Sequence, residues 1–165
     1  MSRIRIHIAT DHAGLETSRT LAAHLRANGH DVQDHGPASF DPDDDYPAFC
    51  INAAKAVVRD QRAGVAALGI VLGGSGNGEQ MAANKVRGVR AALVWNLSTA
   101  KLARQHNDAN VIAIGARQHA EDEVRALIDA FLAEPFSGEA RHVRRIAQLA
   151  EYEATQTIAG KKVDP

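Results

Sequence analysis

The sequence contains one cysteine, Cys50, among 165 residues, so an intramolecular disulfide and a cysteine-based zinc cluster are excluded. No apolar run approaches the roughly 20 residues that span a bilayer, and the first residues lead into a strand-like run without the apolar region of a signal peptide. The formal net charge of -1 gives no global reason to bind nucleic acid or an anionic membrane. We therefore expect a cytoplasmic protein that binds anions only through a local cluster.

The rest of the composition is that of one folded domain. Hydrophobic residues make up 45% of the chain and charged residues 24%, as in ordinary globular proteins, and the length suits one two-sided α/β core. We expect a single domain over residues 1–153 and a flexible tail over residues 154–165.

Strand-like and helix-like segments alternate along the chain. Apolar spacing and helix-end signals predict strands at residues 4–9, 31–34, 67–72, 89–94 and 111–114, and helices at 15–28, 47–59, 79–85, 98–105, 119–133 and 138–153. Ser98 is the expected N-cap of its helix. The alternation predicts an α/β fold: a doubly wound, Rossmann-like, five-stranded parallel sheet with helices on both faces.

Polar clusters follow several of these strands. They are Asp11-His12, the glycine-rich loop at residues 73–78, His106-Asn107 and Gly115-Ala116-Arg117. Because ligands of open α/β sheets bind beyond the carboxyl ends of the strands, we expect these clusters to converge on one edge of the sheet.

The glycine-rich loop fits neither common nucleotide-binding pattern. A dinucleotide fingerprint starting at Gly74 requires glycine where Glu79 stands, and a P-loop requires lysine after Gly78, which Glu79 again replaces. The glycines can still direct backbone N–H groups at a small anion or at an oxyanion formed during a reaction. At the helix start, the dipole would hold Glu79 ionised as a base. The alternative is a tight turn in which Glu79 is only a favoured helix-start residue.

The last predicted helix carries a pair of arginines. Arg141 and Arg145 are four residues apart and project from one face, so they could bind a phosphate dianion together. The pair is expected to have no local acidic partner until Glu151, which supports phosphate binding. The alternative is a solvated basic face.

The histidines and the cysteine can be explained by structural roles as well as by catalytic ones. His106 could compensate the dipole at a helix end, and Asp11-His12 could be an acid–base pair or a turn. The eight histidines show no H-E-x-x-H spacing, so we predict no metal. Cys50, among small apolar residues, is expected to be buried filler.

Taken in order, the motifs resemble the ribose-5-phosphate isomerase B family, which includes galactose-6-phosphate isomerase subunits. The resemblance covers roughly residues 3–153 and depends on Asp11-His12-Ala13-Gly14, Asp45-Tyr46-Pro47, Gly74-Ser75-Gly76-Asn77-Gly78, Ala82-Ala83-Asn84-Lys85, His106-Asn107, Gly115-Ala116-Arg117 and Arg141 with Arg145. It implies aldose–ketose isomerisation without a cofactor, typically of D-ribose 5-phosphate to D-ribulose 5-phosphate through a cis-enediolate.

The resemblance also implies roles for individual residues. Glu79 would be the base, His106 would open the furanose ring, and Ser75 would stand beside the oxyanion. The residues implied in substrate binding are Asp11, Asn107 and Tyr46 for the sugar, Gly74, Ser75, Gly76, Asn77 and Gly78 for the enediolate, and His12, Arg117, Arg141 and Arg145 for the phosphate.

One position departs from the commoner pattern. Many members place a cysteine base where this chain has Gly73, and glycine cannot accept a proton. Glu79 resembles the base of a glutamate-using branch found among actinobacteria. A carboxylate is ionised near neutral pH without a lowered pKa, whereas a thiol is not.

The family resemblance further implies a homodimer, with a tetramer as an alternative, in which His106, Asn107 and the C-terminal arginines complete the partner's site. Two other functions stay open: isomerisation of a six-carbon sugar phosphate, and a non-catalytic sugar-phosphate-binding subunit. A nucleotide-binding, flavodoxin-like module is disfavoured by Glu79.

Overall fold

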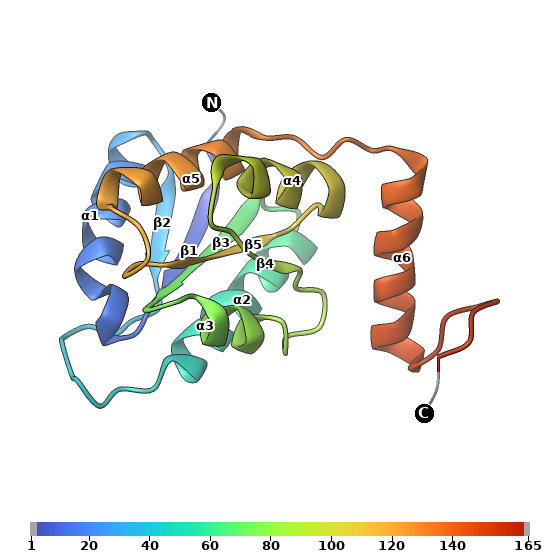
Figure 1. The fold of residues 1–165 in the computed structure, drawn as a ribbon, viewed down its shortest axis with the longest axis horizontal. Coiled ribbons are helices and arrows are strands. Elements are labelled where there is room, and N and C mark those ends of the chain that lie inside the picture. The colour runs from blue at the N-terminus through green and yellow to red at the C-terminus, as the bar shows by residue number, and fades with distance from the viewer. Residues whose placement is uncertain (1–2, 164–165) are drawn as a thin grey trace.

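The computed structural model describes residues 3–163 and contains one five-stranded sheet in which all strands are parallel (Figure 1). The strands are β1 (Arg5–Ala9), β2 (Asp31–Asp34), β3 (Ala67–Gly73), β4 (Ala91–Leu93) and β5 (Val111–Gly115). Their order across the sheet is β2-β1-β3-β5-β4. The chain winds from β1 to one edge, returns to β3 and continues to the other edge, which confirms the predicted doubly wound sheet.

Helices cover both faces of the sheet (Figure 1). They are α1 (Leu15–Ala27), α2 (Tyr46–Arg62), α3 (Asn77–Ala83), α4 (Leu97–Asn107), α5 (Glu121–Ala133) and α6 (Ala140–Thr155). On one face, α1, α4 and α5 bury large side chains such as Leu25 and Phe131 against the sheet. On the other face, α2 and α3 pack mainly through alanine and valine. Each large side chain fully buried in this way contributes roughly 1.5–3 kcal/mol, so the two layers hold the strand ends in place.

The last helix, α6, stands away from these two layers (Figure 1). It is amphipathic, but Val143, Leu149 and Tyr152 remain exposed, whereas its buried residue is His142. None of the helices within residues 3–163 is both long and apolar enough to cross a membrane. An apolar helix face left in solvent is the kind of surface that a further chain covers.

Several element boundaries differ from the prediction. The N-cap of α4 is Asn96 and not Ser98, because Asn96 Oδ1 accepts the Thr99 N–H at 2.8 Å while Thr99 Oγ1 accepts the Asn96 N–H at 3.3 Å. Gly76 adopts a left-handed conformation that starts α3 at Asn77, two residues before the predicted start. At the C-terminus α6 ends at Thr155, and residues 164–165 of the predicted tail lie outside the described part of the chain.

Candidate active site

The glycine-rich loop joins β3 to α3 at the carboxyl edge of the sheet. Gly76 has φ of 81°, and a Cβ there would also meet Leu93 and the backbone of Ile114. The Ala116 N–H donates to the Gly73 carbonyl at 2.7 Å, which ties the loop after β5 to the loop after β3. The loop is therefore fixed before any ligand arrives, as a preorganised set of N–H donors requires.

The carboxyl group of Glu79 lies directly over Gly73. It occupies the space in which a side chain at position 73 would stand, and Glu79 is only 4% exposed. Burial raises the pKa of Glu79, the hydrogen bond from its own N–H lowers it, and the Asp11 carboxylate raises it. Burial thus acts against the helix dipole, which was predicted to hold Glu79 ionised. A carboxyl group with a raised pKa suits a base that must also return its proton.

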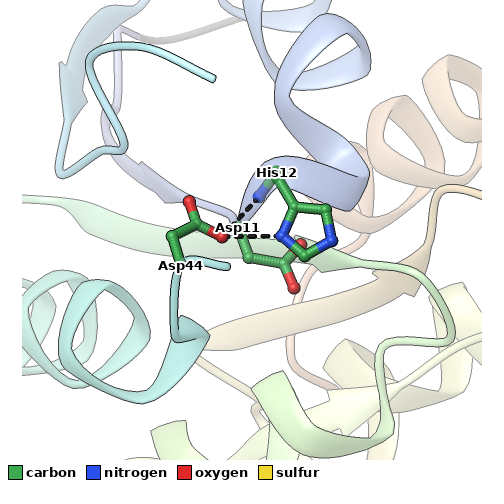
Figure 2. Close-up of side chains that lie close together, drawn as sticks. All are labelled: Asp11, His12 and Asp44. Carbon is green, nitrogen blue, oxygen red and sulfur yellow. Dashed lines mark hydrogen bonds and ion pairs between the residues drawn. The ribbon is translucent and has the colours of Figure 1, made fainter. Parts of the chain in front are cut away.

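Asp11, His12 and Asp44 lie together where β1 ends (Figure 2). Asp11 Oδ1 accepts the Ala13 N–H at 2.9 Å and caps the short helical turn His12–Gly14. His12 Nδ1 lies 2.7 Å from Asp44 Oδ1. One ligating atom from each of these three side chains lies within 4.8 Å of the others, so the group could hold a cation. The absence of a metal therefore stays a prediction.

Tyr46, Ser75 and Arg117 lie around the glycine-rich loop. A Cβ on Gly78 would collide with the ring of Tyr46, so the two are in close contact. Ser75 is exposed, and its hydroxyl accepts the backbone N–H of Asn77 at 3.3 Å. The Arg117 side chain passes 3.7 Å from the position that a Cβ on Gly74 would occupy. The carboxyl edge thus brings together the predicted residues from the loops after β1, β3 and β5.

His106 and Asn107 lie elsewhere in the same chain. They end α4, and Arg90, directly before β4, donates through Nε to the Asn107 carbonyl at 2.9 Å. This is the amino edge of the sheet, so the expectation that all four polar clusters converge on one edge is wrong within one chain. The physical reason is that a crossover helix runs back from the carboxyl edge to the start of the next parallel strand.

The His106 ring packs against a second histidine. Its centroid lies 4.3 Å from that of His142 on α6, whose Nδ1 is 2.9 Å from the Ser137 hydroxyl. Burial, and then the neighbouring His106, lowers the pKa of His142, so a neutral ring supports His106.

Arg141 and Arg145 are both exposed on α6. Arg141 Nε pairs with Glu139 at 2.9 Å, so the view that Arg141 lacks a local acidic partner is wrong. The two side chains are both more than half exposed, and such pairs are worth about 0–1 kcal/mol. The pair therefore holds Arg141 only weakly.

Asp44 and His142 were not identified from the sequence. Asp44 stands in a run of aspartates in which nothing distinguishes it from its neighbours, and its partner His12 is 32 residues away. His142 follows Arg141 directly, but its position against His106 depends on how α6 leaves α5. Neither residue carries a local sequence signal for its contact.

Cys50 is fully buried on α2, as predicted. Burial, together with the charges of Glu79 and Asp11, raises the pKa of its thiol to about 12. At neutral pH the nucleophilic thiolate is therefore scarce and inaccessible.

Iodoacetamide should consequently leave the activity of the native protein unchanged, and Cys50→Ala should change kcat/KM by no more than about twofold. Activity after timed exposure, with mass spectrometry of the same samples, tests this. Labelling in guanidinium chloride is the positive control, because unfolding exposes the thiol. Loss of activity in step with labelling of the native protein would make Cys50 part of the chemistry.

An open parallel sheet with a buried carboxyl group beside a glycine-rich loop at its carboxyl edge is typical of α/β proteins that bind small molecules at that edge. Comparisons place the chain more narrowly. It matches the family model of ribose/galactose isomerases over residues 6–149.

Relatives and solved structures agree with that match. The chain is 54% identical to ribose-5-phosphate isomerase B of Mycolicibacterium paratuberculosis over 152 residues, which cover 92% of this chain and 93% of that protein. It is 53% identical to ribose-5-phosphate isomerase B of Mycobacterium tuberculosis over 155 residues, 94% of this chain and 93% of that protein. The structure of ribose-5-phosphate isomerase B from Mycoplasma genitalium with bound ribulose-5-phosphate has a TM-score of 0.86 at 41% identity, covering 94% of this chain and 99% of that chain.

The chain therefore belongs to the ribose/galactose isomerase family. The resemblance seen in the sequence motifs is confirmed at the level of the family and of the fold. Assignment to the glutamate-using branch, and the role of each site residue, stay predictions.

Proposed function

We propose that this protein is an enzyme that interconverts D-ribose 5-phosphate and D-ribulose 5-phosphate through a cis-enediolate. The names of its relatives support ribose 5-phosphate as the substrate. In this chain the proposal rests on the position of the Glu79 carboxyl over Gly73, beside the glycine-rich loop. The substrate is a small sugar phosphate, no cofactor takes part, and the expected location is the cytoplasm.

Glu79 acts as the single base in the proposed reaction. Its carboxylate removes the proton from C2 of the open-chain aldose, and the C–H electrons form the C1–C2 double bond as O1 takes the negative charge. The carboxyl then returns a proton to C1, while a proton moves from O2 to O1 and leaves a ketone at C2. Both electrons stay in the substrate, so the step needs no redox partner.

The glycine-rich loop stabilises the enediolate in this proposal. Backbone N–H groups of residues 74–78, with the Ser75 hydroxyl alongside, face the developing negative charge. A preorganised donor of this kind is worth roughly 2.7–4 kcal/mol in the transition state. Because Gly76 and its neighbours are already fixed against β5, that stabilisation is not spent on ordering the loop.

Substrate hydroxyls and phosphate are bound by the remaining site residues. Asp11 and Tyr46 of the same chain, and Asn107 of a second chain, contact the sugar. His12 and Arg117 of one chain, with Arg141 and Arg145 of the other, surround the phosphate.

A homodimer is part of the proposal, with a tetramer as a larger alternative. His106, which opens the furanose ring, lies at the amino edge of its own sheet and can serve a loop at the carboxyl edge only in another copy. An apolar cavity of about 370 Å³ lies between α6 and the body, lined by residues including Ile146, Leu149, Val89 and Ala92. With the exposed apolar residues of α6, this region offers a surface for a second copy of the chain.

Substrate choice is tested by comparing kcat/KM for D-ribose 5-phosphate and D-allose 6-phosphate. We expect the five-carbon substrate to be favoured by about tenfold or more, since one additional carbon unit in a fitted pocket is worth 10- to 200-fold. A preference for allose 6-phosphate would support the six-carbon isomerase instead. Binding of ribose 5-phosphate without turnover would support the non-catalytic subunit.

A further inference from the structure

We propose that Asp44 is a positioning residue for His12: its carboxylate holds Nδ1–H and fixes the ring so that an Nε2–H is presented to the phosphate of the substrate. The inference goes beyond the family site residues and rests on the proposed function only where the phosphate is concerned. Figure 2 shows the Asp44 carboxylate lying against the His12 ring and backbone.

The contact is made twice by one oxygen. Asp44 Oδ1 accepts the His12 backbone N–H at 3.0 Å and lies 2.7 Å from His12 Nδ1. The short, charge-assisted bond fixes the ring plane, and the backbone bond fixes the residue that carries the ring. The distances leave the His12 ring little freedom of rotation.

The chemistry of the pair fixes the tautomer. An ionised carboxylate can only accept hydrogen bonds, so the ring nitrogen beside Asp44, Nδ1, must carry a proton. Nε2 is then the ring nitrogen left for the ligand, and it binds a phosphate oxygen as an N–H donor when the ring carries both protons. The same logic governs metal-binding histidines, whose second nitrogen is held by a carboxylate that orients the first.

The aspartate-rich turn at residues 41–45 places this one side chain against His12. Asp41 accepts the Asp43 N–H through Oδ1 at 3.0 Å, and its carbonyl accepts the Asp44 N–H at 3.2 Å, which forms the turn. Asp43 and Asp45 are exposed, whereas the Asp44 side chain is only 9% exposed. Asp44 Oδ2 is buried and has no hydrogen-bond partner within residues 3–163. Burying a carboxylate with one oxygen unsatisfied lowers stability, so the position of Asp44 is better explained by function than by folding.

The test uses Asp44→Ala, the isosteric Asp44→Asn and the exposed neighbour Asp43→Ala as control. Long-range ¹H–¹⁵N NMR of the ligand-free protein should show His12 protonated at Nδ1, and this signature should be lost in Asp44→Ala. The KM for ribose 5-phosphate should rise about tenfold or more in Asp44→Ala, with a much smaller change in kcat, because the lost interaction is with the non-reacting phosphate. Asp44→Asn keeps an acceptor for Nδ1–H and should recover most of the KM, while Asp43→Ala should match the wild type.

Several results would overturn the inference. An unchanged His12 tautomer in Asp44→Ala, equal effects in Asp44→Ala and Asp43→Ala, or a fall in kcat at constant KM would each contradict a positioning role. Activity that disappears on chelation and returns with Mn²⁺ would make Asp44 a metal ligand instead. If the wild type fails to turn over ribose 5-phosphate, the proposed function fails, but the tautomer and the affinity for inorganic phosphate still test the Asp44–His12 pair. Should Asp44→Ala fail to fold, the same measurements on Asp44→Asn decide, with a smaller expected rise in KM.

Discussion

Glu79→Gln is expected to lower kcat by at least about 10²-fold and up to roughly 10⁴-fold, the range that a positioned general base contributes. The amide has nearly the shape of the carboxyl group that fills the space over Gly73, so the loop should keep its conformation. It cannot accept the C2 proton, however, and the enediolate is never formed. Exchange of the C2 proton of ribose 5-phosphate with D₂O, followed by NMR, measures this step directly.

Two matched variants separate the base from its surroundings. Glu79→Asp keeps the charge but withdraws the carboxylate by one methylene, and a displacement of about 1 Å can cost roughly 10²-fold in rate. Gly73→Ala keeps Glu79 itself, yet its methyl group would collide with the carboxyl and should displace it, with a similar loss. Affinity for inorganic phosphate should stay near the wild-type value in all three variants. Near-wild-type turnover by Glu79→Gln would show that another group removes the proton.

The fold was largely predictable because its signals are local. The alternation of strand-like and helix-like segments located all five strands, and β2 matches the prediction residue for residue although it is not an apolar run. The misplaced N-cap of α4 shows the limit: Asn96 and Ser98 are both good capping residues, and the choice was decided by the reciprocal bond with Thr99. Propensity alone cannot separate two such candidates that lie two residues apart.

The site was predictable only in part. The prediction that the loops after β1, β3 and β5 form the site follows from the rule that ligands bind at the carboxyl ends of parallel strands. Burial of Glu79 is a tertiary property, because it requires the missing side chain of Gly73 and the cover of neighbouring loops. The misplaced expectation for His106 has a topological cause: its residue type and helix-end position are visible in the sequence, but the edge of the sheet it occupies depends on the direction of α4.

Mixing two inactive variants should restore activity. In the proposed homodimer each site combines the glycine-rich loop of one chain with His106 of the other. A heterodimer of one Glu79→Gln chain and one His106→Asn chain then holds one doubly defective site and one intact site. After random reassortment half of the dimers are heterodimers, so the mixture should regain about a quarter of wild-type activity. Co-refolding the two variants, or isolating the heterodimer through two different affinity tags, allows the measurement.

The control combines two variants that damage the same part of the site, the base that each chain supplies. Glu79→Gln removes the base and Gly73→Ala displaces it, so both sites of a heterodimer of these two variants lack a working base and should stay inactive. Recovery in the first mixture but not in the second requires that His106 acts on the loop of the partner. If an isolated Glu79→Gln/His106→Asn heterodimer shows no recovery, His106 acts in the site of its own chain. For that to happen, the C-terminal end of α4 would have to move from the amino edge of the sheet to the carboxyl edge. The hydrogen bond between Arg90 Nε and the Asn107 carbonyl would then have to break, so the same outcome predicts that removing the Arg90 side chain leaves activity intact or raises it.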